Sequence, residues 1–239
     1  MELKLDLHIH SEHSPDGRMS LQQIKQACKT AGLNGCAICD HDRVLTETDA
    51  DPGFLVIPGV EISTEYGHLL GLFVSKPIET RKFHEAVLCI HEQNGLAVLA
   101  HPFEHRTDAK QIEPLVPFLD GVEIWNSRAE RKNKKANAMA SRFAETHCLC
   151  RFAGSDAHVQ QEIGNAVLTL QTEVFTMDAV KTALQNNQIH IIGRRSPARF
   201  TALSQLIKRK KTGASPAAYI KWGLFAVKCL VQDLISKGE

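Results

Sequence analysis

Apolar runs of strand length alternate with amphipathic stretches of helical length along most of the chain. We expect strands at residues 3–9, 36–39, 54–58, 68–74, 96–100, 121–125, 149–153 and 166–170. Helical periodicity predicts helices at residues 21–31, 79–93, 129–146 and 177–185. This alternation is typical of an α/β fold.

Histidine and acidic side chains gather where the predicted strands end. The set consists of His8, His10, Asp16, His41, Glu61, His68, His101, Asp156 and His158. In an α/β barrel the carboxyl ends of the strands face one mouth, and that mouth carries the active site. If the fold is a barrel, these side chains therefore form one cluster in space.

The residue types in this set favour metal binding. In the pairs His8/His10 and Asp156/His158 both side chains lie on one face of an extended chain, because the side-chain period of a strand is two. Nine donors are too many for one tetrahedral ion, so we expect two to three divalent ions. Imidazole mixed with carboxylate favours Mn, Zn or Fe over Ca or Mg.

The same residues lie in strings that occur together in a known family. These strings are LDLHIHSEHSPDG, CDHD, PGVEIST, GHLLGLF, AHPF and AGSDAH, and the match runs from about residue 3 to 197. In combination they resemble the successive motifs of the PHP (polymerase and histidinol phosphatase) family of metal-dependent phosphoesterases. The resemblance implies a distorted (β/α)7 barrel with a trinuclear metal site at the C-terminal ends of its strands.

The resemblance also implies how the donors share the ions. One ion would be held by His8, His10, Glu61 and Asp156, a second by Asp16, His41 and His158, and a third by His68 and His101 with Glu61 as the bridge. Glu61, Asp156 and His158 would be the catalytic residues. Cys39 stands where the family often has Thr, which puts no ligand in doubt.

Charge arithmetic indicates the class of substrate. Three divalent ions with three carboxylates and neutral histidines leave an excess of about +3, which calls for anions. A bridging hydroxide and a phosphate oxyanion would satisfy it, so we expect hydrolysis of a phosphate ester by attack of a metal-bridging hydroxide. The turn Ser14-Pro15-Asp16-Gly17 looks more like family members that act on a nucleotide, a nucleoside bisphosphate or an oligonucleotide end than like histidinol phosphatases.

Three residues outside the cluster are candidates for binding the substrate. Arg128 follows a predicted strand and Arg194 lies in Gly193-Arg194-Arg195-Ser196-Pro197, and a guanidinium can bind phosphate through a bidentate fork. The resemblance adds Asn126, because similar positions line the mouth in the family. The alternative for each arginine is a solvated position on the surface.

Two other functions remain open at this point. An amidohydrolase also uses His-x-His on a barrel, but commonly bridges its metals with a carboxylated lysine, and no predicted strand here ends in Lys. A non-catalytic binding module could retain the metals for stability alone. The complete set of donors argues weakly against this second alternative.

Composition and charge add a division of the chain. The 239 residues are 43% hydrophobic and 23% charged, which excludes a disordered or fibrous protein. Residues 1–193 carry 18 basic and 25 acidic side chains, whereas residues 194–239 carry 10 and 2. We expect a barrel domain over residues 1–200 and a basic, amphipathic helical tail over residues 201–239.

The N-terminus shows no signal or transit peptide, and the seven cysteines lack a disulfide spacing. Both observations predict a cytoplasmic location.

The tail has its own pattern. Its apolar residues recur on one helix face at Ile220, Leu224, Val227, Val231 and Leu234, after the basic run at residues 208–211. We expect an attachment device outside the active site, in contact with a membrane surface, a nucleic acid or a protein. Lys221, Lys228 and Asp233 argue against a membrane span. The alternative is that this helix packs on the barrel or on a second subunit.

Overall fold

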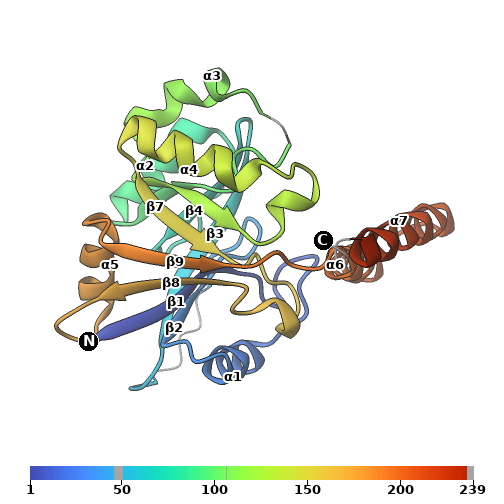
Figure 1. Cartoon of the computed structure of the whole chain (residues 1–239), viewed down its shortest axis with the longest axis horizontal. Coiled ribbons are helices and arrows are strands. Elements are labelled where there is room, and N and C mark those ends of the chain that lie inside the picture. The colour runs from blue at the N-terminus through green and yellow to red at the C-terminus, as the bar shows by residue number, and fades with distance from the viewer. Residues whose placement is uncertain (46–50, 106, 236–239) are drawn as a thin grey trace.

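The computed structural model describes residues 1–45, 51–105 and 107–235, and within them nine strands form one sheet (Figure 1). The strands are β1 (Glu2–Ile9), β2 (Gly35–Ile38), β3 (Leu55–Thr64), β4 (Gly67–Leu72), β5 (Leu96–Leu99), β6 (Gly121–Asn126), β7 (Cys150–Gly154), β8 (Ala166–Gln171) and β9 (Ile189–Gly193). Their order in the sheet is β7-β6-β5-β4-β3-β2-β1-β8-β9. All the predicted strands are present, and β9 is an addition.

The sheet closes on itself at one end. Just past β7, Asp156 N donates to His8 O at 2.8 Å and His10 N donates to Ala157 O at 2.9 Å, so the chain after β7 pairs with the end of β1. Strands β1 to β7 therefore form a ring around the mouth. The first half of β1 pairs instead with β8, which carries β9 on its other edge. The predicted seven-stranded barrel is confirmed, with β8 and β9 as an antiparallel extension.

The distortion of the barrel lies in the hairpin β3–β4. The sequence predicted that β3 would end at Pro58, but residues 59–64 continue it because they pair antiparallel with β4. β4 runs antiparallel to β3 and to β5. The start of β4, rather than its end, therefore lies at the mouth, and this places His68 there.

The expected helices are present with shifted ends, and α3 and α6 are additions. They are α1 (Leu21–Thr30), α2 (Phe83–Glu92), α3 (Ala109–Ile112), α4 (Ala136–His147), α5 (Met177–Gln185), α6 (Ala198–Lys211) and α7 (Pro216–Ile235), with 3₁₀ turns η1 (Glu113–Phe118), η2 (Ala129–Arg131) and η3 (Gln160–Glu162). Helix α1 begins at Leu21 because the residue before it, Ser20, forms a capping box with Gln23. Helix α4 starts later than predicted, since the segment before it forms η2.

An apolar core lies beneath the mouth. Leu5, Ile57, Val98 and Phe152 come from different strands and belong to one buried cluster. A second cluster packs α2 and α4 against the sheet, with Phe83 and Phe143 among its largest members. The core fixes the strands that carry the polar residues above it.

The last two helices form a pair beside the barrel (Figure 1). Trp222 Nε1 donates to Ala202 O at 2.8 Å, and the carboxylate of Asp233 accepts from the first backbone N–H groups of α6. The predicted boundary at residue 200 falls inside α6, which the sequence analysis did not predict. None of the described helices is long and apolar enough to cross a membrane.

Candidate metal centre

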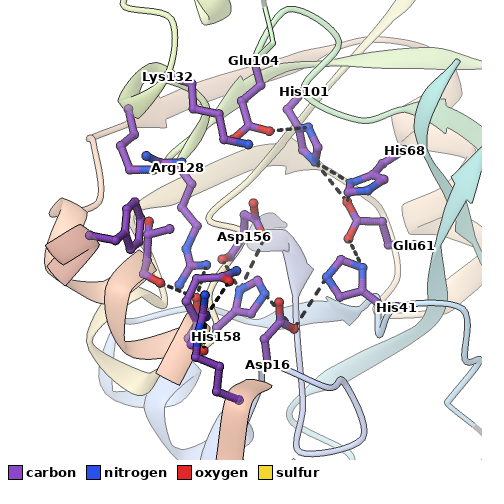
Figure 2. A pocket seen from close by; sticks show the side chains of 16 residues that line it. Asp16, His41, Glu61, His68, His101, Glu104, Arg128, Lys132, Asp156 and His158 are labelled. Atoms are coloured by element: carbon purple, nitrogen blue, oxygen red, sulfur yellow. Dashed lines mark hydrogen bonds and ion pairs between the residues drawn. The ribbon is translucent and has the colours of Figure 1, made fainter. Parts of the chain in front are cut away.

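The barrel brings all nine predicted donors together at its mouth. His8 and His10 lie at the end of β1 and are fully buried, while the other seven line a cavity of about 340 Å³. These seven are Asp16, His41, Glu61, His68, His101, Asp156 and His158, and Figure 2 shows them around one space. The spatial clustering expected from the sequence is confirmed.

Glu61 is the centre of this arrangement. Its Oε1 lies 2.8 Å from His68 Nδ1 and 3.0 Å from His101 Nε2. Its Oε2 lies 2.9 Å from His41 Nδ1 and 3.5 Å from His10 Nε2. A single buried carboxylate thus contacts histidines on both sides, which is the position a bridging ligand needs.

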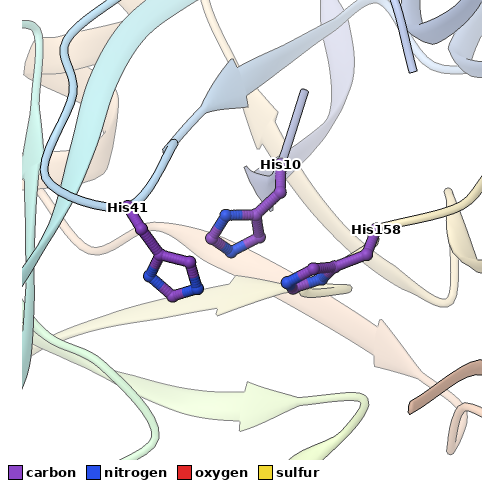
Figure 3. A group of neighbouring side chains, drawn as sticks. All are labelled: His10, His41 and His158. Atoms are coloured by element: carbon purple, nitrogen blue, oxygen red, sulfur yellow. The ribbon is translucent and has the colours of Figure 1, made fainter. Parts of the chain in front are cut away.

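Three groups of donors can be distinguished. They are His8, His10 and Asp156; Glu61, His68 and His101; and His10, His41 and His158, the last shown in Figure 3. Within each group the donor atoms lie within 4.8 Å of one another. The division resembles the one implied by the family motifs, with two differences: Glu61 is absent from the group of His8, and His10 rather than Asp16 joins His41 and His158. Asp16 Oδ1 lies beside that third group, 3.3 Å from His158 Nε2.

The donors fit divalent transition metals. His8 Nε2 lies 3.1 Å from His10 Nε2, so two ring nitrogens face each other where one proton at most can be shared. Asp16 Oδ1 is buried and has no hydrogen-bond partner among the described residues. Buried polar atoms normally have partners, and a cation between these groups would provide them. Imidazole and carboxylate together suit Zn, Mn or Fe.

The titration of the cluster follows from its crowding. Burial would raise the pKa of Glu61, but the positive charges of His68, His41 and His8 hold it well below its usual range. Burial lowers the pKa of His10 to about 3, with a further contribution from the charge of His158. Burial also acts on His41, yet Glu61 and Asp16 outweigh it and raise that pKa to about 11. The cluster without metal therefore holds several protons at neutral pH.

Glu123 supports the donors from behind, and sequence reasoning missed it. Its Oε1 lies 3.0 Å from His8 Nδ1, and its Oε2 accepts from the backbone N–H of His101 and from Asn126 Nδ2, each at 3.0 Å. A carboxylate on the outer nitrogen of a ligating histidine fixes the orientation of the ring. Glu123 lies inside β6, whereas most of the predicted donors follow or open strands. The available signal was that Glu123 is the one charged residue of β6.

The backbone at the mouth contains one close approach between strands and two donor residues with positive φ angles. A Cβ on Gly154 would lie 2.1 Å from His8 Cβ, so glycine lets β7 approach β1. Asp156 has φ of 55° and His101 has φ of 28°, which non-glycine residues rarely adopt. Such outliers cluster at functional sites, where the surrounding structure holds them in place.

The structure places the three predicted substrate-binding residues differently. Asn126 is buried and donates to Glu123 and, at 3.4 Å, to Asp156 Oδ2. Arg128 borders the cavity, but its Nε donates to Glu162 Oε1 at 2.8 Å and its second nitrogen to Oε2 of the same carboxylate. Arg194 is exposed, donates to Asn165 and is not among the residues lining the cavity. Phosphate binding by these residues stays a prediction.

A cationic wall was not predicted. Arg131, at the end of η2, and Lys132, just after it, line the cavity, and Arg209 lines it from α6. Lys132 pairs with Glu104 at 2.9 Å, whereas neither Arg131 nor Arg209 forms an ion pair with a carboxylate in the described part of the chain. Arg209 donates to Gln205 and to Ala218 O. The sequence analysis expected the tail to lie outside the active site, yet α6 forms part of this wall.

Replacing Arg128 by Ala is expected to destabilise the fold by about 3–5 kcal/mol, because it leaves the buried charge of Glu162 without its partner. Chemical denaturation measures the loss. Arg194→Ala, at an exposed position, serves as the control and should change the free energy of unfolding by less than about 0.5 kcal/mol. An Arg128→Ala protein of unchanged stability but raised KM would instead assign Arg128 to the substrate.

Sequence comparisons connect the chain to known proteins. Residues 134–189 match the family described as PHP-associated. An uncharacterized protein of Methanocaldococcus jannaschii is 32% identical over 174 residues, which cover 70% of this chain and 70% of the relative. A 5'-3' exoribonuclease of Haemophilus influenzae is 36% identical over 85 residues, or 32% of this chain and 31% of that protein.

A structural comparison supports the same fold. A two-domain protein from Bacteroides vulgatus, described as containing a predicted PHP-like metal-dependent phosphoesterase, superposes with a TM-score of 0.66 at 17% identity. The match covers 85% of this chain and 69% of that one. At this level of identity the similarity establishes the architecture alone.

Proposed function

Because the chain belongs to the PHP family of metal-dependent phosphoesterases, we propose that it hydrolyses a phosphate ester at the mouth of the barrel. The observation that carries the proposal is the set of three donor groups around Glu61 beside an open cavity. A site retained for stability alone would have no need of the adjoining cavity. Such a cavity with convergent polar groups is the usual form of a substrate site.

The nine donors have separate tasks in this proposal. His8, His10, Asp16, His41, Glu61, His68, His101, Asp156 and His158 would hold two to three ions. When bound, these ions would supply Lewis-acid charge to a phosphoryl group and lower the pKa of a water molecule. Glu61 fixes the spacing of the groups on either side of it. Glu123 and Asn126 orient His8 and Asp156, so the donors keep their geometry while substrate binds.

The exposed side of the cluster indicates where the substrate enters. His8 and His10 are fully buried, whereas the side chain of His68 is 36% exposed and that of His41 is 19% exposed. The reacting phosphate therefore meets the donors on the side of His41 and His68. Asp156 and His158 border the same cavity and would hold the catalytic ions from its other side.

The cationic wall supports an anionic substrate larger than one phosphate. Arg131 and Arg209 present positive charge without a carboxylate partner among the described residues, and Phe225 adds an aromatic ring beside Arg131. We propose a nucleotide, a nucleoside bisphosphate or an oligonucleotide end, whose remaining phosphates and bases would contact this wall. The similarity to an exoribonuclease over 85 residues supports the same class.

The test is a substrate panel with Mn, Zn and Fe supplied in turn. It includes phosphomonoesters, nucleoside bisphosphates and short oligonucleotides, together with amides and lactones. We expect ester hydrolysis near neutral pH from the nucleotide group, detected as released phosphate or released nucleotide, and a raised KM for Arg209→Gln with kcat little changed. Turnover of amides or lactones without phosphate release would favour the amidohydrolase alternative. The amidohydrolase alternative commonly needs a lysine as the bridge between its metals. In this proposal Glu61 is the bridge, and the one lysine among the described residues that line the cavity, Lys132, is paired with Glu104.

A further inference from the structure

Helix α7 presents an apolar face that nothing in the described chain covers. Seven large apolar side chains of this helix are between 49 and 72% exposed: Ile220, Leu224, Val227, Leu230, Val231, Leu234 and Ile235. We call this set the outer face of α7. A contiguous exposed patch of this kind marks an interaction site in a natural protein.

The opposite side of the helix is already in use. Phe225 and Ala226 pack with buried Cys229 against Ala198 and Ala202 of α6. Trp222 is held by its hydrogen bond to Ala202 O. Figure 1 shows α7 as the outermost element on its side of the molecule. Packing on α6 therefore accounts for one side of α7, and the outer face stays uncovered by the described residues.

The charges around the outer face are of one sign. Lys221 and Lys228 lie two turns apart along its border and are exposed. The acidic side chain within the described part of α7, Asp233, is used to cap α6 and to pair with Arg199. Residues 194–239 carry a net charge of +8 and residues 1–193 carry −7. An anionic surface would therefore attract this end of the molecule and repel the other.

We propose that the outer face of α7 binds an anionic lipid bilayer, with the helix lying in the plane of the interface. Apolar side chains would enter the boundary between headgroups and acyl chains, and lysine stems at the border would reach the lipid phosphates. A second copy of the chain fits less well. The apolar residues of α7 recur at alternating spacings of four and three. The positions that flank this repeat are Lys221, Gly223, Lys228 and Leu230, and none of them carries a negative charge that could pair with the lysines of a second α7.

The test is sedimentation of the full chain with vesicles, scored without substrate, so that its outcome is independent of the proposed hydrolysis. One vesicle type is phosphatidylcholine alone, and the other also contains phosphatidylglycerol. We expect binding to the second type that weakens as salt is added. Leu224→Glu should weaken this binding at least about tenfold, because it places a charge in the apolar contact.

A matched control is available on the barrel. Leu88 of α2 is 62% exposed, and Leu88→Glu introduces the same change away from α7, so it should leave vesicle binding unchanged. Equal loss in both variants, or a wild-type protein that stays in the supernatant with both vesicle types, would overturn the proposal. Light scattering then assigns the face: a mass of two chains that falls to one in Leu224→Glu identifies a second copy as its partner.

Discussion

Glu61→Gln is expected to lower phosphoesterase turnover by roughly a thousandfold, more than any single histidine replacement, because a bridge between ions contributes several kcal/mol and each 1.36 kcal/mol is tenfold in rate. Glu61 contacts His10, His41, His68 and His101 through two oxygens. An amide keeps the size of the side chain but offers a single neutral acceptor. Turnover and metal content per chain are the measurements.

The control for this substitution is Glu92→Gln, at an exposed position of α2 outside the cavity lining. It should leave turnover and metal content unchanged. Thermal melting of Glu61→Gln separates loss of fold from loss of metal. If Glu61→Gln retains wild-type turnover, the assignment of Glu61 as the bridge is wrong.

Removing metal is expected to abolish the activity completely, and restoring Mn, Zn or Fe should return it together with two to three equivalents of bound ion. The nine donors in three overlapping groups are the reason, since one ion would leave most of them unpaired. Elemental analysis gives the stoichiometry. Less than one equivalent after loading would contradict a multinuclear site.

The metal-free protein should also respond to pH in a defined direction. Burial opposes protonation, but Glu61 with its neighbours raises the folded-state pKa of His101 to about 9 and that of His41 to about 11. Because these values lie above the unfolded value of about 6.5, the stabilisation is full below pH 6.5 and is lost as pH rises through 9 and 11. Bound metal needs unprotonated imidazole, so its stabilising effect grows as pH rises. Melting curves at pH 7 and 10, with chelator and with metal, measure both trends.

Most of the donors could be found from the sequence because they follow or open a strand, where spacing and fold class together fix their position. His101 is an example, since it follows the unbroken apolar run of residues 96–100. Glu61 was found although β3 does not end where expected. The hairpin with β4 lengthens the strand, but it leaves Glu61 facing inward at the same mouth.

The role of Glu123 behind the donors and the cationic wall of the cavity could not be predicted, because both depend on contacts between distant parts of the chain. Glu123 acts on His8 across 115 positions of sequence, and Arg128 meets its partner Glu162 through the packing of η3. Helix α6 has weak amphipathic character and many basic residues, so periodicity did not distinguish it from a linker. Its place at the cavity is a result of tertiary packing.

Two different parts of the chain build the two sides of the cavity, and this has a consequence for how such proteins diversify. The strands and the loops at their mouth ends carry every donor, whereas Ser204, Gln205 and Arg209 come from a helix pair that follows the last strand. Substitutions confined to the final helices would therefore alter which ester is accepted, while the donors of the proposed hydrolysis stay unchanged. In protein engineering, the same division would allow the helix pair to be varied while the metal donors of the barrel are kept.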